Sequence, residues 1–282
     1  MKIMVLGAAG MAGHVVETYL TECGHDIYTV ARNRTSSSKN RPIDVTDFRA
    51  LEAWLDEVQP AVIVNCIGLL QKSCEQRPDL AVLVNSYLPH CIANKYTHSE
   101  TRLIHLSTDC VFSGKRGGYK ETDITDGDTM YDRSKALGEV INNKDLTFRM
   151  SIIGPDCNKN GTGLFHWFMN QTGKISGFRK AIWSGVTTIE LARAIDSAIS
   201  QNLTGLYQLS PKDPIDKYAL LMLFKEVFKR EVEIYPNDEI ILDKSLINTS
   251  TDFDFSIKGY REQIEDMYMW VKTHGNMYEY GV

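Results

Sequence analysis

Residues 2–13 read Lys-Ile-Met-Val-Leu-Gly-Ala-Ala-Gly-Met-Ala-Gly, and this stretch decides the fold class of the 282-residue chain. The apolar run 2–6 predicts a short buried strand, and a helical pattern follows the glycines. Gly7 would permit a tight turn, Gly10 would let the backbone approach a pyrophosphate, and Gly13 would let the helix pack closely on the strand. The helix N-terminus would then face the phosphates. We therefore predict a dinucleotide-binding unit here rather than a plain strand-to-helix turn.

Strand-like and helix-like segments continue to alternate along the chain, which favours an α/β fold with a doubly wound parallel sheet and helices on both faces. We predict a Rossmann-type domain over residues 1–155, to which a strand near 205–210 returns. Residues 156–282 are expected to form a smaller α/β domain that binds the substrate. Further strands are expected at 26–30, 61–66, 102–106 and 146–153, a loop at 31–42, and helices at 48–58 and 79–95.

The composition indicates a soluble enzyme of moderate size. The chain carries 36 acidic and 31 basic residues, for a net charge of -5, which argues against a dedicated binder of nucleic acid or membrane surfaces. No apolar run is long enough to cross a membrane, and the first residues predict a strand instead of a signal peptide, so we expect a cytoplasmic protein. The six cysteines lack C-x-x-C spacing, so we expect no metal site and no disulfide framework.

A tyrosine and a lysine one helical turn apart, Tyr131 and Lys135, form the candidate catalytic pair. On one face of a helix, the ammonium would lower the pKa of the phenol and make it a usable proton donor or acceptor. Thr108 would supply a second hydroxyl. The spacing alone is weak evidence, because Tyr268 and Lys272 repeat it in a segment that predicts an amphipathic surface helix. The surrounding motifs must therefore distinguish a catalytic pair from a chance spacing.

Four further segments carry a family resemblance. Residues 106–123 begin Leu-Ser-Thr-Asp-Cys-Val-Phe, residues 131–139 read Tyr-Asp-Arg-Ser-Lys-Ala-Leu-Gly-Glu, residues 65–68 read Asn-Cys-Ile-Gly, and residues 84–89 begin Val-Asn-Ser and end in Pro. Together with the glycine turn, they resemble the extended short-chain dehydrogenase/reductase superfamily and, within it, the dTDP-4-dehydrorhamnose reductase (RmlD-like) sugar-nucleotide group. The resemblance is strong over residues 1–155 and loose over most of the rest.

The resemblance implies an NAD(P)-dependent oxidoreductase that reduces the 4-keto group of a nucleotide-activated 6-deoxy sugar in cell-surface polysaccharide biosynthesis. The cofactor would supply the hydride while Tyr131 gives a proton to the developing alkoxide. Lys135 would lower the pKa of the phenol and hydrogen-bond the nicotinamide ribose. Thr108 would hold the carbonyl oxygen, although its hydroxyl could instead satisfy local backbone groups at the strand end.

The end of the second strand bears on the choice of cofactor. An acidic residue there would bind the ribose hydroxyls of NAD, but this chain has Arg32, Asn33 and Arg34. Guanidinium groups suit a 2'-phosphate, so we predict NADPH, with NADH as the alternative if the arginines are solvated loop residues. Besides the glycines and the catalytic pair, the cofactor-binding candidates are Met11, Ala12, Arg32, Asn33, Asp44, Val45, Cys66, Ile67, Gly68, Asn85 and Ser107.

Weaker signals indicate the substrate site. The candidates that directly follow Thr108 are Asp109, Cys110, Val111 and Phe112. Trp183 precedes a Gly-Val-Thr-Thr turn, and its ring could stack on a base or a sugar. Most of the aromatic residues at 165–168 could belong to the core of the smaller domain, and for Trp167 and Phe168 this explanation is at least as good as contact with a ligand. Trp183 is therefore the better ligand candidate.

Cys110 leaves a second activity open. The GDP-fucose synthase branch, which epimerises before it reduces, has a cysteine two residues beyond its catalytic hydroxyl, and Cys110 stands two residues beyond Thr108. A thiol there could move protons next to the ketone, with His166 as the candidate partner acid. We place simple 4-keto reduction ahead of this activity. A third alternative is a non-catalytic NADP-binding regulatory subunit, similar to that of methionine adenosyltransferase. Because the superfamily often dimerises, a homodimer is one expected arrangement.

Overall fold

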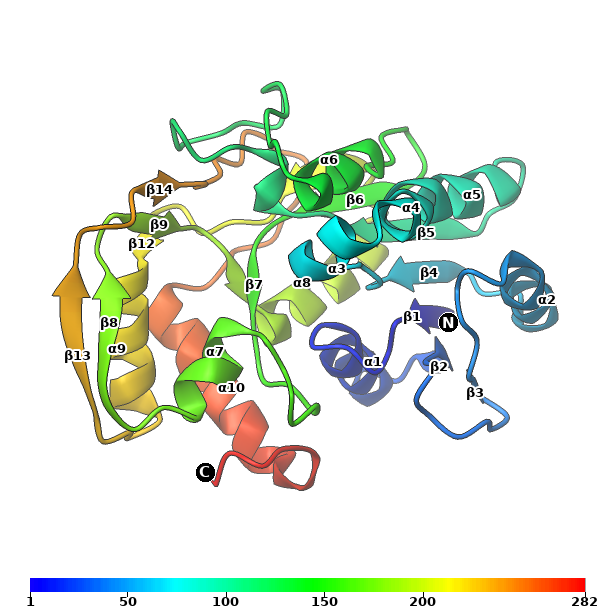
Figure 1. Cartoon of the computed structure of the whole chain (residues 1–282). Coiled ribbons are helices and arrows are strands. Elements are labelled where there is room, and N and C mark those ends of the chain that lie inside the picture. Colours follow the sequence, from blue (N-terminus) through cyan, green and yellow to red (C-terminus); the bar gives the residue numbers. More distant parts are fainter. Residues whose placement is uncertain (282) are drawn as a thin grey trace.

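The computed structural model describes residues 1–281, and its largest element is a seven-stranded parallel sheet (Figure 1). The strands are β1 (Lys2–Leu6), β2 (Asp26–Val30), β3 (Asn40–Arg41), β4 (Val62–Asn65), β5 (Arg102–Leu106), β6 (Leu146–Arg149) and β11 (Gly205–Gln208). Their spatial order is β11-β6-β5-β4-β1-β2-β3. The order reverses at β1, and sheets of this kind bind ligands beside such a reversal. The prediction of a Rossmann-type doubly wound α/β fold is confirmed.

Helices cover both faces of the sheet, because successive side chains of a strand point to opposite sides. The covering helices are α1 (Gly13–Glu22), α2 (Phe48–Val58), α3 (Gln71–Gln76), α4 (Pro78–Ala81), α5 (Leu88–Lys95), α6 (Met130–Leu137) and α8 (Thr188–Ser200). Ile3 and Val5 of β1 join a buried apolar cluster with α1 and α8. Met4 and Leu6 join a second cluster with α2 and α5. Both faces of β1 are therefore buried, as its uninterrupted apolar run predicts.

The predicted helix 79–95 has a π-helical turn in its middle. It consists of α4, the π turn η1 (Val82–Tyr87) and α5. Asn85 lies in this turn, and π turns inside helices frequently occur at functional sites. The inserted residue shifts the 3.6-residue periodicity only locally, which is why the apolar pattern did not reveal it.

The predicted strand 146–153 breaks after Arg149. The Met150 carbonyl accepts from the N–H of Asp109 at 3.2 Å, and the Ser151 carbonyl accepts from the N–H of Val186 at 2.9 Å. The chain thus leaves the large sheet, and β7 (Ile152–Ile153) pairs with β10 (Val186–Thr187) instead. The predicted loop 31–42 also differs, since β3 extends the sheet edge beside β2.

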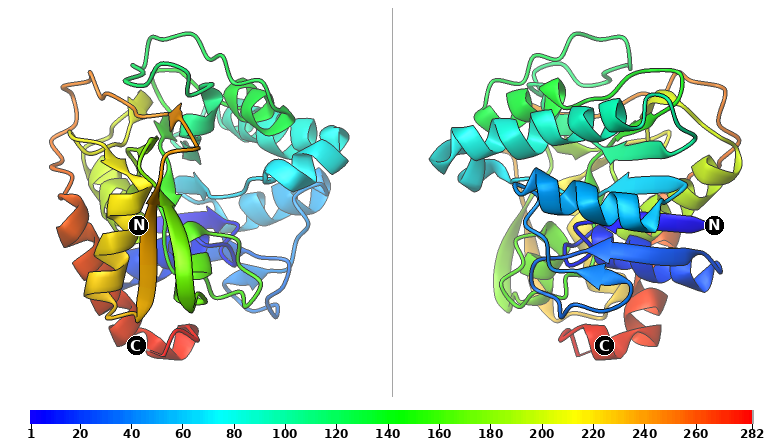
Figure 2. Two further views of the ribbon diagram at one scale, coloured as in Figure 1. Left: turned by 60° about the vertical axis from the view of Figure 1, so that its left-hand side comes forward. Right: turned by 90° about the vertical axis from the view of Figure 1, so that its right-hand side faces the viewer.

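The remaining elements form a smaller layer. They are α7 (Leu164–Met169), β8 (Gly173–Phe178), β9 (Ala181–Trp183), β12 (Ile215–Asp216), α9 (Lys217–Val227), β13 (Val232–Asn237), β14 (Leu242–Asp243) and α10 (Tyr260–Thr273), with the short turn η3 (Gly275–Met277). The short turn η2 (Asp109–Val111) instead follows β5 of the large sheet. β9 pairs with β12 and β14, and β13 pairs with β8. The left view of Figure 2 shows the yellow α9 between the red α10 and the orange β13, and α9 contacts both. α8 and β11 also follow residue 156, yet they belong to the layers of the large sheet.

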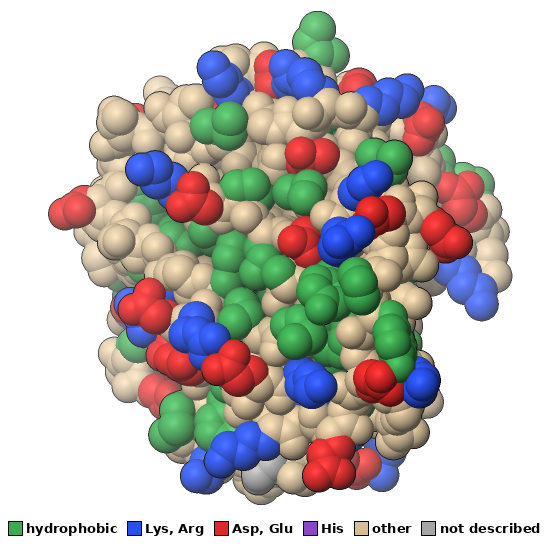
Figure 3. All heavy atoms as spheres, turned by 90° about the vertical axis from the view of Figure 1, so that its left-hand side faces the viewer, with side chains coloured by type: hydrophobic (Ala, Val, Ile, Leu, Met, Phe, Trp, Pro, Cys, Tyr) green, Lys and Arg blue, Asp and Glu red, His purple; other side chains and the backbone are tan. Residues whose placement is uncertain are grey.

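The face formed by α9, β8 and β13 mixes charged and apolar side chains (Figure 3). Lys174 lies 3.5 Å from Glu233, and Arg179 lies 2.7 Å from Asp238. Positive and negative side chains therefore lie next to one another on this face, where the described residues form no large patch of a single charge. Within residues 1–281, no helix combines the length and the apolar character needed to span a bilayer.

Candidate active site

The carboxyl ends of β1, β4, β5 and β6 lie at one edge of the sheet. The strand register pairs Leu6 with Asn65, Asn65 with His105, and Leu106 with Phe148. Candidate segments follow the strand ends there, with the glycine turn after β1, residues 66–68 after β4 and residues 107–112 after β5. The parallel sheet thus brings together segments that lie far apart in the sequence.

The glycine turn after β1 has the shape that a nucleotide phosphate site requires. Gly7 has a φ of 80°, and a Cβ on Gly13 would lie 2.2 Å from the Gly7 carbonyl oxygen. Only glycine at these two positions allows the tight turn and the close start of α1. Gly10 is exposed, and a Cβ there would meet only the Gly7 oxygen, at 3.4 Å. The turn, completed by the half-buried Met11 and the buried Ala12, is therefore open on its outer side and fits a dinucleotide pyrophosphate.

The two arginines after β2 make different contacts. Arg32 is exposed, and its guanidinium lies 3.1 Å from the carboxylate of Asp44. Arg34 is half-buried, pairs with Glu17 at 2.5 Å and donates to the Ala8 carbonyl at 2.7 Å. Arg34 therefore ties the glycine turn to α1, whereas Arg32 keeps its guanidinium in solvent.

The loop after β4 is held by the π turn. Asn85 is buried, accepts from the Leu69 N–H at 2.7 Å and donates to the Leu69 carbonyl at 3.0 Å. Its amide also donates to the hydroxyl of Ser134 in α6 at 3.1 Å. A Cβ on Gly68 would meet only Asn85 Oδ1, at 3.9 Å, so the loop is open there. Burial raises the pKa of Cys66 to about 12, which keeps this thiol neutral and inert as a nucleophile.

Tyr131 lies in the first turn of α6, beside Thr108. A reciprocal capping box between Thr129 and Asp132 fixes the start of this helix. Burial raises the pKa of the Tyr131 phenol above its ordinary value, and hydrogen bonding with Thr108 opposes this only in part. The pKa of Tyr131 is therefore raised overall and not lowered as the spacing predicted, because desolvation of the phenolate outweighs the favourable contacts.

Lys135 is buried, with 3% of its surface exposed. Its Nζ donates to the Leu106 carbonyl at 2.6 Å and lies 3.5 Å from Nε2 of His105. Burial lowers the pKa of Lys135 to about 8, against the attraction of Glu139. Neither His105 nor Glu139 was among the predicted residues. The position of Glu139 four residues after Lys135, just beyond the end of α6 at Leu137, could have indicated this carboxylate as a neighbour of the lysine. A histidine within an apolar strand could have indicated His105.

A buried ion pair supports the loop after β5. Arg149 Nη2 lies 2.6 Å from Glu139 Oε2, with the two side chains 2% and 5% exposed. The Ser107 hydroxyl donates to Glu139 Oε1 at 2.7 Å. The guanidinium lies 4.9 Å from the centre of the Phe112 ring, which stacks on Tyr119 at 4.2 Å. The Glu139–Arg149 pair thus contacts both Ser107 and Phe112 of this loop.

The four candidates after Thr108 separate into two groups. The Thr108 hydroxyl donates to Asp109 at 3.2 Å and accepts from the Cys110 N–H at 3.1 Å. Burial raises the pKa of Asp109 and raises that of Cys110 to about 12. Val111 and Phe112 are fully buried in a small apolar cluster. Asp109 and Cys110 therefore flank the Thr108 hydroxyl, while the next two residues pack the loop.

Trp183 lies deeper than its predicted role suggests. It is 6% exposed, and its ring centre lies 5.6 Å from that of Tyr260. Phe165 and Phe168 are fully buried in the same core, and only Trp167 of this group is exposed. The burial favours a packing role for Trp183, and its contact with a substrate stays a prediction.

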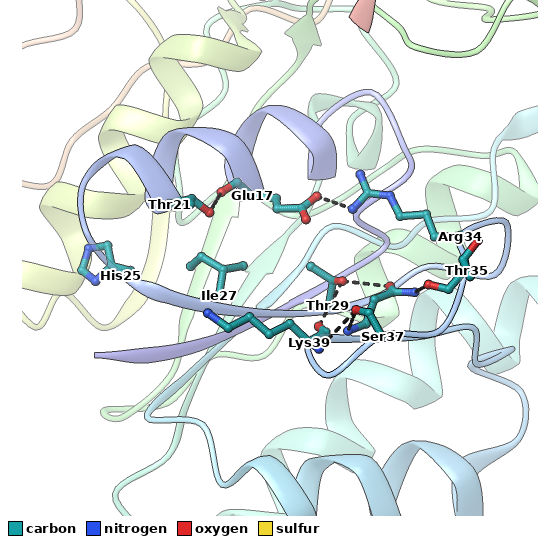
Figure 4. A pocket seen from close by; sticks show the side chains of 10 residues that line it. Glu17, Thr21, His25, Ile27, Thr29, Arg34, Thr35, Ser37 and Lys39 are labelled. Atoms are coloured by element: carbon teal, nitrogen blue, oxygen red, sulfur yellow. Dashed lines mark hydrogen bonds and ion pairs between the residues drawn. The ribbon is translucent and has the colours of Figure 1, made fainter.

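A separate pocket of about 370 Å³ lies between α1 and the β2–β3 edge (Figure 4). Its lining includes Glu17 and Arg34, whose ion pair appears as a dashed line in the figure. None of the three catalytic candidates lines it. All six cysteines are free, and no group of three or more His, Cys, Asp or Glu side chains within residues 1–281 is arranged to hold a metal ion.

Comparisons with known proteins bear on this site. A protein of Haloferax volcanii named "Probable low-salt glycan biosynthesis reductase Agl14" is 32% identical over 161 residues, which is 54% of each chain. The dTDP-4-dehydrorhamnose reductase of Streptomyces griseus is 33% identical over 138 residues, covering 48% of this chain and 43% of that protein. The chain thus spans about half the length of the curated relatives it matches.

The fold has close structural counterparts. The dTDP-4-dehydrorhamnose reductase of Bacillus anthracis, solved in complex with NADP, superposes with a TM-score of 0.81 at 21% identity, over 95% of this chain and 99% of that one. The model of the RmlD substrate binding domain family matches residues 1–230. The chain therefore belongs to the RmlD substrate binding domain family, as the resemblance of its motifs predicted.

Proposed function

We propose that this protein is an NADPH-dependent reductase that converts the 4-keto group of a nucleotide-activated 6-deoxy sugar to an alcohol, in the synthesis of cell-surface polysaccharides. The observation that carries the proposal is the placement of the Tyr131 phenol beside the Thr108 hydroxyl, with Lys135 buried one helical turn away. Family membership and the names of the relatives support the substrate class.

The cofactor would lie across the glycine turn and the open loop at residues 66–68. Arg32, whose guanidinium lies in solvent beside Asp44, would bind the 2'-phosphate of NADPH. Arg34 is already engaged by Glu17, so it would contribute less. Bound at this edge of the sheet, the nicotinamide would supply the hydride. NADH stays the alternative cofactor.

The chain's own side chains would handle the proton. The raised pKa of Tyr131 keeps its phenol protonated at neutral pH, which suits a donor to the alkoxide formed during reduction. Thr108 would hold the substrate carbonyl oxygen through its hydroxyl. Lys135, with a pKa of about 8, would be mostly cationic at pH 7 and would bind the nicotinamide ribose.

We assign cofactor binding to residues 1–155 together with β11, and substrate binding to residues 156–282. Asp109 and Cys110 would contact the sugar from the catalytic side, and Trp183 is the candidate from the other. The proposed compartment is the cytoplasm, where a reducing environment suits six free cysteines. A homodimer is the proposed assembly.

Epimerisation before reduction is the weaker alternative. It would require Cys110 to exchange protons, but with a pKa of about 12 its thiol holds its proton at neutral pH. The proposed partner acid, His166, has one ring nitrogen 3.0 Å from the Tyr280 hydroxyl and the other 3.2 Å from the Lys159 carbonyl. Both of its nitrogens are therefore occupied by the C-terminal part of the fold.

The test is NADPH oxidation at 340 nm with a panel of 4-keto-6-deoxy nucleotide sugars. Turnover of at least one sugar is expected, with conversion of the ketone to an alcohol. Tight NADPH binding without oxidation by any member would instead support the non-catalytic regulatory subunit. No specific observation in the structure favours that outcome, because all three catalytic side chains are present.

A further inference from the structure

His105 is fully buried at the end of β5, directly beneath the candidate catalytic lysine. Its Nδ1 lies 3.1 Å from the amide nitrogen of Asn65, and its Nε2 lies 3.5 Å from Nζ of Lys135. The same Nζ donates to the Leu106 carbonyl at 2.6 Å. Both ring nitrogens therefore face nitrogen atoms, and neither faces a carboxylate.

The surrounding hydrogen bonds assign the tautomer of this ring. Asn65 Oδ1 accepts from the Ile67 N–H at 3.1 Å, which fixes the amide orientation and turns Nδ2 toward His105. An amide nitrogen only donates, so Nδ1 of His105 must accept. In the neutral ring the hydrogen then sits on Nε2 and faces Lys135.

The protonation state of Lys135 decides whether this contact is favourable. An ammonium has three donors and no lone pair, so it would oppose the Nε2–H as a second donor. A neutral amine has a lone pair that can accept this hydrogen. We propose that His105 is a positioning residue that donates a hydrogen bond to the neutral amine of Lys135, and so makes Lys135 a proton source for Tyr131.

This inference rests on the proposed reductase function and adds one step to it. After the Tyr131 O–H bond breaks and its proton passes to the substrate alkoxide, the phenolate takes a proton from the Lys135 ammonium through an intervening hydroxyl or water. A Lys135 N–H bond breaks and the Tyr131 O–H bond forms again. The resulting amine accepts from His105 Nε2–H until solvent water returns a proton to it.

The other ionisable groups around Lys135 act in the opposite direction. Glu139, just beyond the end of α6, raises the pKa of Lys135 through its negative charge, and Cys74 of α3 and Cys66 after β4 act in the same direction. Burial and the positive charges of Lys135 and His90 lower the pKa of His105 well below its ordinary value. His105 therefore stays neutral where Lys135 titrates, and it acts through its N–H rather than through a charge.

The decisive measurement is the titration of Lys135 in the cofactor-free protein. Lysine side chains labelled with ¹³C at Cε are followed by NMR, and the Lys135 signal is assigned by its absence in Lys135→Met. In His105→Gln the amide oxygen can accept from the ammonium, so the midpoint is expected to rise by about one pH unit. His90→Gln is the control and should leave the midpoint unchanged. A midpoint that does not rise in His105→Gln overturns the inference.

A second variant covers the case in which His105→Gln does not fold. Asn65→Leu keeps the ring but removes the donor to Nδ1, so the imidazole can shift its hydrogen and accept from the Lys135 ammonium through Nε2. The midpoint should again rise, whereas a merely structural His105 predicts no change. The titration needs no substrate. Failure of the wild-type chain to turn over any sugar would overturn the proposed function, and the proton step with it, but not the hydrogen bond between His105 and Lys135. An unmoved midpoint would overturn that hydrogen bond and leave the proposed function standing.

Discussion

The side-chain nitrogen of Lys135 lies 2.6 Å from the carbonyl oxygen of Leu106, the last residue of β5. The lysine of α6 is thus anchored to the neighbouring strand rather than to a carboxylate, since the nearby Glu139 is paired with Arg149. A cation held in this way is poorly compensated, which is the physical reason that its pKa falls to about 8.

Replacing this lysine should stabilise the fold while removing activity. The pKa of Lys135 is lowered from 10.5 to about 8, so between these values the unfolded chain binds more protons and wild-type stability rises with pH. Below pH 8 Lys135 is charged in the folded state, and the cost of burying this charge lowers the free energy of unfolding. Lys135→Met should therefore be more stable than the wild type at pH 7 by roughly 2 kcal/mol, and the gain should shrink toward pH 10. Thermal unfolding by circular dichroism measures both, and a lower Tm for the variant at pH 7 would contradict the argument.

Removing the phenolic hydroxyl should remove most of the turnover. Tyr131→Phe is expected to lower kcat by about 100- to 10,000-fold, the range typical of a lost general acid. Tyr268→Phe is the matched control, because Tyr268 has the same spacing to Lys272 but lies on α10, where the ammonium is 5.8 Å from its ring centre. Equal loss in the two variants would sink the assignment of Tyr131. Both are compared by steady-state NADPH oxidation.

The buried ion pair should matter far more for stability than an exposed one. Glu139→Gln leaves the Arg149 guanidinium buried without its counter-charge, and we expect a loss of about 3–5 kcal/mol in the free energy of unfolding. Glu226→Gln removes the charge of the exposed pair with Arg261 at 2.8 Å, and little change is expected there because solvent screens the attraction. Urea denaturation gives both values. A loss below that of the exposed control would show that solvent reaches Arg149.

Arg32 should set the preference for NADPH. Arg32→Ala is expected to raise KM for NADPH by roughly 10-fold through the loss of one charge-assisted contact, with little change in KM for NADH. Arg77→Ala, at an exposed arginine paired with Asp79, is the control. If both cofactors lose affinity equally, Arg32 contributes to folding of the loop and not to recognition of the 2'-phosphate.

Cys110 should be dispensable for the proton chemistry. Its thiol, with a pKa of about 12, is protonated throughout the range about pH 6–9, so Cys110→Ser should keep kcat within a few-fold of the wild type. In deuterated water, no deuterium should enter C3 or C5 of the sugar. Mass spectrometry of the product checks this, and exchange that disappears in Cys110→Ser would reinstate the epimerase-reductase alternative.

Local patterns were sufficient for the fold class. The apolar run 2–6, the glycine turn and the alternation of strands and helices each depend on residues that are neighbours in the chain, and they led to the observed parallel sheet. The interruptions at the π turn and after Arg149 were missed, because each follows from hydrogen bonds to distant segments. Asn85, for example, holds Leu69 and Ser134.

The sequence by itself determined which chemical groups are available: the glycines that a phosphate turn needs, the hydroxyls of Thr108 and Tyr131, and the amine of Lys135. Only the tertiary structure decided the pKa values and the hydrogen-bond partners of these groups. The strand register brings His105 and Asn65 under Lys135, and burial raises the pKa of Tyr131 where the helical spacing alone predicted a decrease. The reason is physical. A charge on a side chain depends on how much water and which partners surround it, and both are set by segments that meet only when the sheet forms.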